Sequence, residues 1–377
     1  MSYLCLFERK RLPVWGRNRH LYRCGAPALL SVASLVVLLA GCATKPSAKV
    51  NYTFFPPAPD EPRIQFLTSF SSDIDLGRKP TFLDYITGRP VGPSPLVKPY
   101  GLTLKDGMLY VCDTMAGAIE VFDLNKKRAR YFKPKGEGRL QVPINITIDT
   151  DGTRYVADSG RGQVLIYGKD EIYRTALGAR DEMKPTDVAV AADRFYVADI
   201  KGHCVRVYNK ADWKVLYTIP RDPKNEEGKL FSPTNLALDK QGQLWVSDTG
   251  AFAVQVYDRE GKFIRRVGQQ GVAPGLFARP KGIAVDHEGR AYVVDASTQV
   301  VQVFDPEGKL LMFFGQPGAT TQGELYLPAG VTIDYDNVGL FEKLVAPGQK
   351  LEFLVLVTSQ FGDNKVSAYG FLKKKEP

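Results

Sequence analysis

Pro280-Lys-Gly-Ile-Ala-Val-Asp286, Tyr292-Val-Val-Asp295 and Val301-Gln-Val-Phe-Asp305 are three short apolar segments that follow one another closely in the chain. β-Branched and aromatic residues dominate all three, as is typical of β-strands. The residues between the first two, Asp286-His-Glu-Gly289, are typical of a turn. The stretch from 280 to 305 therefore predicts consecutive antiparallel strands.

The same pattern recurs along the chain. The second segment returns with endings at Asp113, Asp158, Asp199, Asp248 and Asp295, and in a degenerate sixth copy at Gln360. Each copy follows a strand led by a proline: Pro99, Pro143, Pro185, Pro233, Pro280 and Pro328, at intervals of 44, 42, 48, 47 and 48 residues. A fourth strand follows several copies, for example at 262–267. Four antiparallel strands in a repeat of this length describe one blade, so the fold class is all-β and the architecture a six-bladed β-propeller.

The ends of the repeat predict how the ring closes. Residues 63–70, Arg-Ile-Gln-Phe-Leu-Thr-Ser-Phe, look like the last strand of a blade, whereas the sixth copy ends near Phe371 without one. We therefore expect this N-terminal strand to complete blade six and leave no long free edge. Two segments outside the repeat, 80–88 and 336–350, suit short helices, the second through its apolar residues at 338–345. Both either cover the apolar ends of blades or form a docking surface.

The complete pattern at 280–305 resembles the NHL-repeat family, and the resemblance covers roughly residues 62 to 371. It implies an NHL-like six-bladed propeller. It implies little about activity, because propellers serve both as binding modules and as enzymes.

The first residues read as an export signal. Residues 1–41 hold six Lys or Arg and one Glu, and an uncharged apolar run of 14 residues spans 26–39, too short for the ~20 residues that cross a bilayer. The run ends in Leu39-Ala-Gly-Cys42, which resembles the lipobox of bacterial lipoproteins. That resemblance implies cleavage before Cys42 and a lipid on its thiol. The alternative is an ordinary signal peptide with a chance cysteine.

The predicted organisation follows from these segments. Residues 1–41 are the signal peptide, 42–61 a lipidated cysteine with a Pro-rich tether reaching ~60 Å at ~3.3 Å per residue, 62–372 the propeller, and 373–377 a basic tail. Ala43 follows Cys42 where many inner-membrane lipoproteins have Asp. The resemblance therefore implies an exported protein anchored in the outer membrane of a Gram-negative bacterium.

Charge and cysteine content exclude several functions. The formal charge is +9 for the whole chain but +4 from Cys42 onward, which argues against a nucleic-acid partner. Besides Cys42, only Cys112 and Cys204 follow the leader, so no disulfide framework is indicated. The two histidines there, His203 and His287, are too few for the zinc site of the peptide-amidating lyase propellers. The recurring Asp of each second strand indicates a turn residue, not a catalytic acid.

A candidate site lies two residues after each leading proline. These positions hold Gly101, Asn145, Asp187, Asn235, Gly282 and Gly330, and in a propeller they surround one mouth of the central channel. The oxygens of Asn145, Asp187 and Asn235 suit Ca²⁺, which related lactonases hold in a similar place. The competing interpretation is backbone geometry, because Gly, Asn and Asp best tolerate positive φ. We favour geometry, and we expect no cofactor.

Three functions remain for such a chain. The first is a non-enzymatic scaffold that binds another envelope protein. Resemblance to lipoproteins of cytochrome-rich bacteria, carried by Leu356-Val-Thr-Ser-Gln-Phe-Gly362, points to electron-transfer or secretion complexes. The second is a calcium-dependent hydrolase or lactonase with its site in the channel. The third is a polysaccharide-binding module with an exposed aromatic platform.

Overall fold

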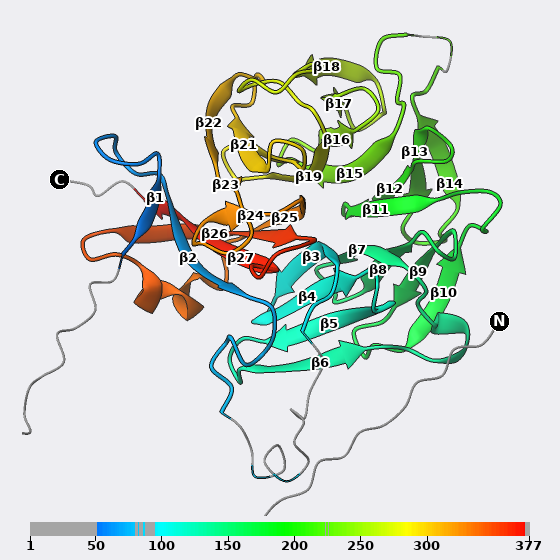
Figure 1. Cartoon of the computed structure of the whole chain (residues 1–377). Coiled ribbons are helices and arrows are strands. Elements are labelled where there is room, and N and C mark those ends of the chain that lie inside the picture. The colour runs from blue at the N-terminus through cyan, green and yellow to red at the C-terminus, as the bar shows by residue number, and fades with distance from the viewer. Residues whose placement is uncertain are drawn as a thin grey trace, which may run out of the picture. The chain divides into compact units, whose positions relative to one another are not determined.

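Six antiparallel sheets surround a common axis in the computed structural model, which describes residues 51–79, 82, 86, 95–222, 224 and 226–373 (Figure 1). Blades one to three comprise β3 (Pro99–Lys105), β4 (Met108–Asp113), β5 (Ala118–Asp123) and β6 (Arg128–Phe132); β7 (Pro143–Ile148), β8 (Arg154–Asp158), β9 (Gln163–Tyr167) and β10 (Tyr173–Leu177); and β11 (Pro185–Val190), β12 (Arg194–Asp199), β13 (Cys204–Asn209) and β14 (Val215–Ile219). Blades four and five comprise β15 (Pro233–Leu238), β16 (Leu244–Asp248), β17 (Ala253–Tyr257) and β18 (Phe263–Val267); and β19 (Pro280–Val285), β20 (Ala291–Asp295), β21 (Val300–Phe304) and β22 (Leu310–Phe314). Blade six comprises β25 (Pro328–Asp334), β26 (Lys350–Ser359), β27 (Val366–Lys373), β2 (Ile64–Phe70) and β1 (Thr53–Phe55).

The inner strands form a closed ring. Each of β3, β7, β11, β15, β19 and β25 contacts the inner strand of the next blade, and β25 contacts β3. The predicted six-bladed propeller with four-stranded antiparallel blades is therefore confirmed. A short parallel pair, β23 (Gln316–Pro317) with β24 (Glu324–Leu325), and a 3₁₀ turn, η1 (Gly136–Gly138), lie in connections between blades.

The recurring aspartate at the end of each second strand holds the connection that enters its blade. Asp248 is fully buried, and its carboxylate accepts the backbone N–H groups of Phe231 at 2.8 Å and Ser232 at 2.7 Å. It also accepts the N–H groups of Gly250 and Ala251 in its own turn, both at 3.1 Å. Asp158 and Asp295 make the same kinds of contact. The turn role inferred from the recurrence is thus confirmed.

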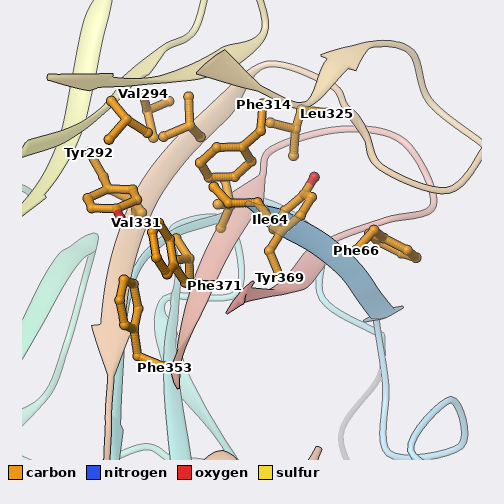
Figure 2. Packing of buried hydrophobic residues seen from close by; sticks show 14 residues of the cluster. Ile64, Phe66, Tyr292, Val294, Phe314, Leu325, Val331, Phe353, Tyr369 and Phe371 are labelled. Carbon is orange, nitrogen blue, oxygen red and sulfur yellow. The ribbon is translucent and has the colours of Figure 1, made fainter. Parts of the chain in front are cut away.

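Strand β2 closes the ring non-covalently, as predicted. It pairs antiparallel with β27, with Phe66 opposite Tyr369. Ile64 is fully buried and Phe70 is 2% exposed. Figure 2 shows Ile64 and Phe66 beside Tyr369 and Phe371 in the cluster that blade six shares with blade five.

The structure corrects the boundary of the tether. Residues 53–55 form β1, which pairs with β2 as a fifth strand of blade six. The Phe55 ring lies 6.2 Å from that of Tyr369 and 6.3 Å from that of Phe314. Since an aromatic side chain gains stability by such packing, the chain is already part of the propeller at Thr53, not at residue 62.

The insertion in blade six forms two 3₁₀ turns where a short helix was expected. These are η2 (Val338–Leu340) and η3 (Glu342–Leu344). Fully buried Gln65 of β2 donates from Nε2 to the Leu344 carbonyl at 2.9 Å, and its Oε1 accepts the Ala346 N–H at 3.0 Å. The insertion therefore covers the closing strand.

Several predicted segments lie wholly or partly outside the residues that the structure describes. The leader, Cys42 and the expected helix at 80–88, apart from exposed Phe82 and Ile86, lie outside the described residues. Lys373 ends β27, and residues 374–377 also lie outside. Within the described part of the chain, no helix has the length and apolarity needed to cross a bilayer.

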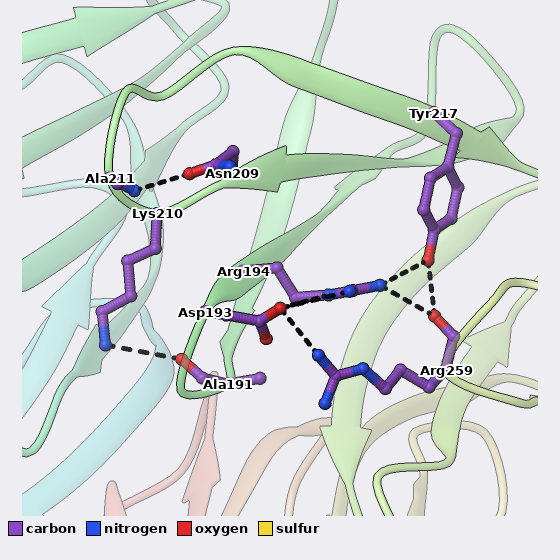
Figure 3. Close-up of polar contacts among 8 residues, drawn as sticks. All are labelled: Ala191, Asp193, Arg194, Asn209, Lys210, Ala211, Tyr217 and Arg259. Atoms are coloured by element: carbon purple, nitrogen blue, oxygen red, sulfur yellow. Dashed lines mark hydrogen bonds and ion pairs between the residues drawn. The ribbon is translucent and has the colours of Figure 1, made fainter.

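Polar contacts between the β11–β12 turn of blade three and the β17–β18 turn of blade four join these two blades (Figure 3). Asp193 Oδ2 accepts from Arg194 at 3.1 Å and from Arg259 at 2.6 Å. Arg194 also donates to Tyr217 Oη at 3.1 Å. Asp193 and Arg259 are about half exposed, so these pairs orient the blades and contribute little free energy.

Candidate functional site

The three polar residues predicted at the channel mouth do meet in the structure. Asn145, Asp187 and Asn235 stand on the inner strands β7, β11 and β15 of consecutive blades. Asn145 Nδ2 donates to Asp187 Oδ1 at 2.7 Å, and Asn235 Nδ2 lies 3.3 Å from Asp187 Oδ2. Asp187 is 3% and Asn235 2% exposed. The three side chains, here called the channel cluster, therefore link blades two, three and four across the axis.

The Asp187 carboxylate is saturated with hydrogen-bond donors. Besides the two amides, Oδ1 accepts the Val188 N–H at 2.7 Å and Oδ2 accepts the Leu236 N–H at 2.9 Å. Burial raises the pKa of Asp187 to about 7, although these four hydrogen bonds oppose the shift. The cost of enclosing the charge thus outweighs the four donors.

This donor set does not fit a calcium site. Calcium takes six to eight oxygens, preferably from carboxylates, whereas the single carboxylate here faces N–H groups on both of its oxygens. Asn145 Oδ1 accepts the Ile146 N–H at 2.9 Å, and only Asn235 Oδ1 has no partner. No group of three or more His, Cys, Asp or Glu side chains suited to a metal occurs among the described residues. The cluster instead joins three neighbouring blades to one another by buried hydrogen bonds.

The three glycines of the same ring of positions make room on the axis. A Cβ on Gly101 would lie 2.0 Å from Asn145 Oδ1, and one on Gly330 would lie 2.4 Å from the Tyr100 carbonyl oxygen. A Cβ on Gly282 would meet the Ala329 carbonyl oxygen at 2.7 Å. None of the six positions has a positive φ. The explanation by positive φ is therefore wrong: close approach of neighbouring blades selects glycine here.

A cavity of about 250 Å³ adjoins the channel cluster. Its walls come from the inner strands and combine aliphatic residues such as Ile146, Val188 and Leu236 with polar side chains and backbone groups, and more of the exposed surface is polar than apolar. The Thr147 hydroxyl donates to the Val188 carbonyl. The lining therefore offers no nucleophile beside a base, and the only titratable group that lines it is Asp187.

Sequence reasoning missed Glu120 of β5, a buried acid that has no hydrogen-bond partner. The side chain is 1% exposed, and neither carboxylate oxygen has a hydrogen-bond partner. Burial first, and then the nearby charges of Asp113 and Asp73, raise its pKa to about 8. The matching positions in blades four and five hold Gln255 and Gln302, which donate to backbone carbonyls. An acid at a glutamine position of the repeat was the signal that could have revealed it.

Replacing Glu120 with Gln is expected to stabilise the protein at about pH 9 and to change little at about pH 5. The folded-state pKa of about 8 exceeds the unfolded value near 4.5, so stability from this bound proton is lost as the pH rises through 8. The gain at pH 9 should be ~2–4 kcal/mol, because one pKa unit corresponds to ~1.4 kcal/mol. Calorimetric unfolding at both pH values measures it. Exposed Glu307→Gln is the matched control, and an equal effect of Glu120→Gln at both pH values would contradict the assignment.

The thiols and histidines of the described residues do not form a reactive site. Cys112 is buried and Cys204 partly so, and both are free. Burial raises the pKa of Cys204 to about 11 and that of Cys112 well above its ordinary value. Thiols with such pKa values are poor nucleophiles at neutral pH. The His287 ring stacks on Tyr335 at 3.8 Å between centroids, and His203 Nδ1 contacts the Phe231 carbonyl.

Exposed apolar side chains occur on both faces of the ring and along the outer strands. The connection face, as we call it, carries the links between blades and the loops between second and third strands. Its exposed large apolar residues include Val97, Met115, Phe231, Val272, Tyr326 and Phe361. The described loops of the opposite face expose Ile172, Trp213, Leu340 and Leu344. Such apolar residues on a surface mark interaction sites when they form contiguous patches.

Comparison with known proteins supports the same class. The model of a family described as "6-bladed beta-propeller" (DUF5128) matches residues 226–318. No curated protein matches the chain. The chain is a six-bladed β-propeller.

Solved structures share this fold at low identity. An inactive variant of virginiamycin B lyase from Staphylococcus aureus with quinupristin has 14% identity and a TM-score of 0.52, over 74% of this chain and 97% of that chain. A gluconolactonase from Xanthomonas campestris has 15% identity and a TM-score of 0.53, over 82% and 90%. A Bacteroides thetaiotaomicron protein of unknown function has 15% identity and a TM-score of 0.55, over 82% and 75%. At these identities the likeness concerns the fold alone.

Proposed function

We propose that this propeller is a lipid-anchored binding module of a bacterial envelope and that its connection face holds a protein partner. The observation that carries the proposal is the exposure of Met115 (69%), Phe231 (47%) and Val272 (76%), in loops of three different blades on that face. Protein partners bury such side chains, and interface cores are enriched in aromatic residues and Met. Electron-transfer or secretion complexes of the envelope are the partners suggested by the lipoprotein resemblance.

The interior supports binding over catalysis. The Asp187 carboxylate is occupied by hydrogen bonds from its neighbours, and it is the one titratable group among the residues that line the adjoining cavity. A hydrolase needs a nucleophile or an activated water beside a base, with room for a substrate. The lyase and the gluconolactonase share this fold, but 14–15% identity transfers no activity to this chain.

The anchor is proposed to be a lipid on Cys42, with the outer membrane as the destination. Because the propeller begins at Thr53, a tether from Cys42 spans only ten residues, which reach about 35 Å when extended. This is shorter than the ~60 Å expected from the sequence. It still allows the propeller to stand clear of the membrane surface.

Photocrosslinking in intact cells tests the proposed face. A photoreactive residue placed at Met115, Phe231 or Val272 is expected to yield discrete heavier products, because a bound partner covers these positions. The same residue at Ile172, exposed on the opposite face, serves as the matched control and is expected to yield none. Products from Ile172 alone, or from no position, would overturn the proposal. Cys42→Ser should in parallel move the protein out of the membrane fraction.

A further inference from the structure

The junction of blades six and one carries a compact apolar and basic patch on the connection face. It is assembled from the link into blade one, the link into blade six, and the loop that follows the second strand in each of these blades. The seam patch consists of Val97, Lys98, Met115, Tyr326, Phe361 and Lys365.

Backbone contacts hold the four segments of the seam patch together. Lys365 Nζ donates to the carbonyls of Val97 and Gln360, both at 2.9 Å. Buried Asp113 accepts the N–H of Val97 at 2.6 Å and that of Met115 at 3.1 Å. The Phe361 N–H donates to the Tyr326 carbonyl at 3.3 Å. The patch is therefore a built surface and not a set of independent loops.

Two rings and two ammonium groups form its centre. The rings of Tyr326 and Phe361, 45% and 43% exposed, lie 6.0 Å apart between centroids. Lys98 Nζ lies 5.7 Å and Lys365 Nζ 6.0 Å from the Phe361 centroid, within reach of a cation–π interaction. Exposed apolar surface thus lies directly beside positive charge.

No ion pair joins Lys98 to a carboxylate in the described part of the chain, whereas Lys365 interacts electrostatically with Asp113 and Asp363. Asp113 is 2% exposed, and its carboxylate accepts hydrogen bonds from backbone N–H groups. Asp363 lies in the same loop as Lys365, but no ion pair joins it to either lysine among the described residues. The patch therefore offers Lys98 as a positive charge without a paired carboxylate among the described residues, beside Lys365, whose charge Asp113 and Asp363 partly balance.

We propose that the seam patch binds a peptide segment of a partner protein that presents a carboxylate beside an aromatic or branched apolar side chain. The inference rests on the proposed function and names the chemistry of the partner. The carboxylate lies between Lys98 and Lys365, and the apolar side chain packs on Phe361 and Tyr326. Charge-assisted hydrogen bonds beside buried aromatic residues are the contacts that carry most affinity at interfaces.

The geometry favours a protein over a membrane surface. The Phe361 and Tyr326 rings are more than half buried, so they cannot enter a bilayer deeply. Lys365 is fixed by two carbonyls, whereas lysines that bind anionic lipid act as mobile point charges. A fixed cation beside a ring is suited to a defined carboxylate.

Selection of short random peptides on the detergent-solubilised lipidated chain provides the test. The selected peptides are expected to share Asp or Glu next to an aromatic or branched residue. The consensus peptide is then synthesised with a fluorophore, and its Kd is measured by fluorescence anisotropy. Phe361→Ala and Lys98→Glu are each expected to weaken binding by at least about tenfold. The double variant Lys169→Glu with Ile172→Ala, on the opposite face, is the matched control and should change Kd by less than about twofold.

Each other result overturns the inference. The selection could fail to enrich peptides, or it could give a consensus without carboxylates. The seam variants and the control could also show equal Kd values although all of them unfold at the same temperature. A wild-type dimer that Phe361→Ala dissociates would assign the patch to a second copy, and binding to vesicles of anionic phospholipid lost in Lys98→Glu would assign it to a membrane. If crosslinks at Phe231 or Val272 persist while the peptides fail, the proposed function stands and only this inference falls.

Discussion

A chain that begins at Ser71 is expected to lose cooperative unfolding, whereas a chain that begins at Asn51 should melt like the mature protein. The first variant lacks β2, so β27 is left as a free edge and the blade five–six cluster loses Ile64 and Phe66. Truncating a single buried large side chain costs ~2–5 kcal/mol, and a whole domain is stable by only ~5–15 kcal/mol. Removing an entire closing strand therefore exceeds the available stability.

Differential scanning calorimetry of both truncated chains measures this effect. A third chain that begins at Pro56 lacks only β1 and the packing of Phe55, and it should fall between them, destabilised by ~2–4 kcal/mol. The tether predicted at 42–61 would instead make residues 53–55 dispensable for stability. If the Ser71 chain melted as sharply and as high as the Asn51 chain, the closure by β2 would contribute nothing, contrary to the pairing with β27.

The second large effect is expected from Asp187→Ala, which should destabilise the protein by ~3–6 kcal/mol. The change leaves the amides of Asn145 and Asn235 and the Leu236 N–H without their acceptor. Each buried donor left unpaired costs about 1–3 kcal/mol. Denaturant unfolding at neutral pH measures the loss. A decrease in the free energy of unfolding below about 1 kcal/mol would show that the channel cluster contributes little to stability.

Asp187→Asn separates the charge of this residue from its shape. The folded-state pKa near 7 exceeds the unfolded value of 3.8, so the stability due to the bound proton is complete below about pH 4 and lost as the pH rises through 7. Wild type should therefore lose up to ~1.4 kcal/mol per pH unit relative to Asp187→Asn across this window. Parallel stability curves for the two proteins would contradict the raised pKa. Excess calcium should leave both melting temperatures unchanged, and a calcium-dependent rise in wild type alone would restore the hydrolase alternative.

The truncation and the Asp187 variants test the stability of the ring and not the binding of a partner. The proposed function therefore rests on the surface residues. Closure by β2 and the channel cluster make a rigid frame, and the frame presents loops of different blades on one face. The seam patch lies where blade six, completed by the N-terminal strand, meets blade one. A partner bound there would contact segments from both ends of the repeat.

The sequence by itself determined the class of fold and the closure of the ring. Both are encoded locally: alternation within each strand, a turn aspartate such as Asp248, and a regular spacing of prolines are visible without knowing what each strand touches. The sixth copy lacks its last strand, and the segment at 63–70 has the pattern of such a strand. The ring is therefore expected to close by pairing this segment with blade six. The same reasoning brought Asn145, Asp187 and Asn235 to one level of the channel, because equivalent positions of a repeat must meet around its axis.

Only the tertiary structure decided what those positions do. Glycine is needed at 101, 282 and 330 because a Cβ there would collide with atoms of the neighbouring blade. The orientation of two amides toward Asp187 likewise depends on residues 42 and 48 positions away in the chain. The burial of Glu120, the packing of Phe55 and the assembly of the seam patch likewise depend on contacts between segments far apart in the chain. A local sequence pattern predicts the period of the repeat. It does not predict which side chains of different blades contact one another, because those contacts depend on distances in the folded chain.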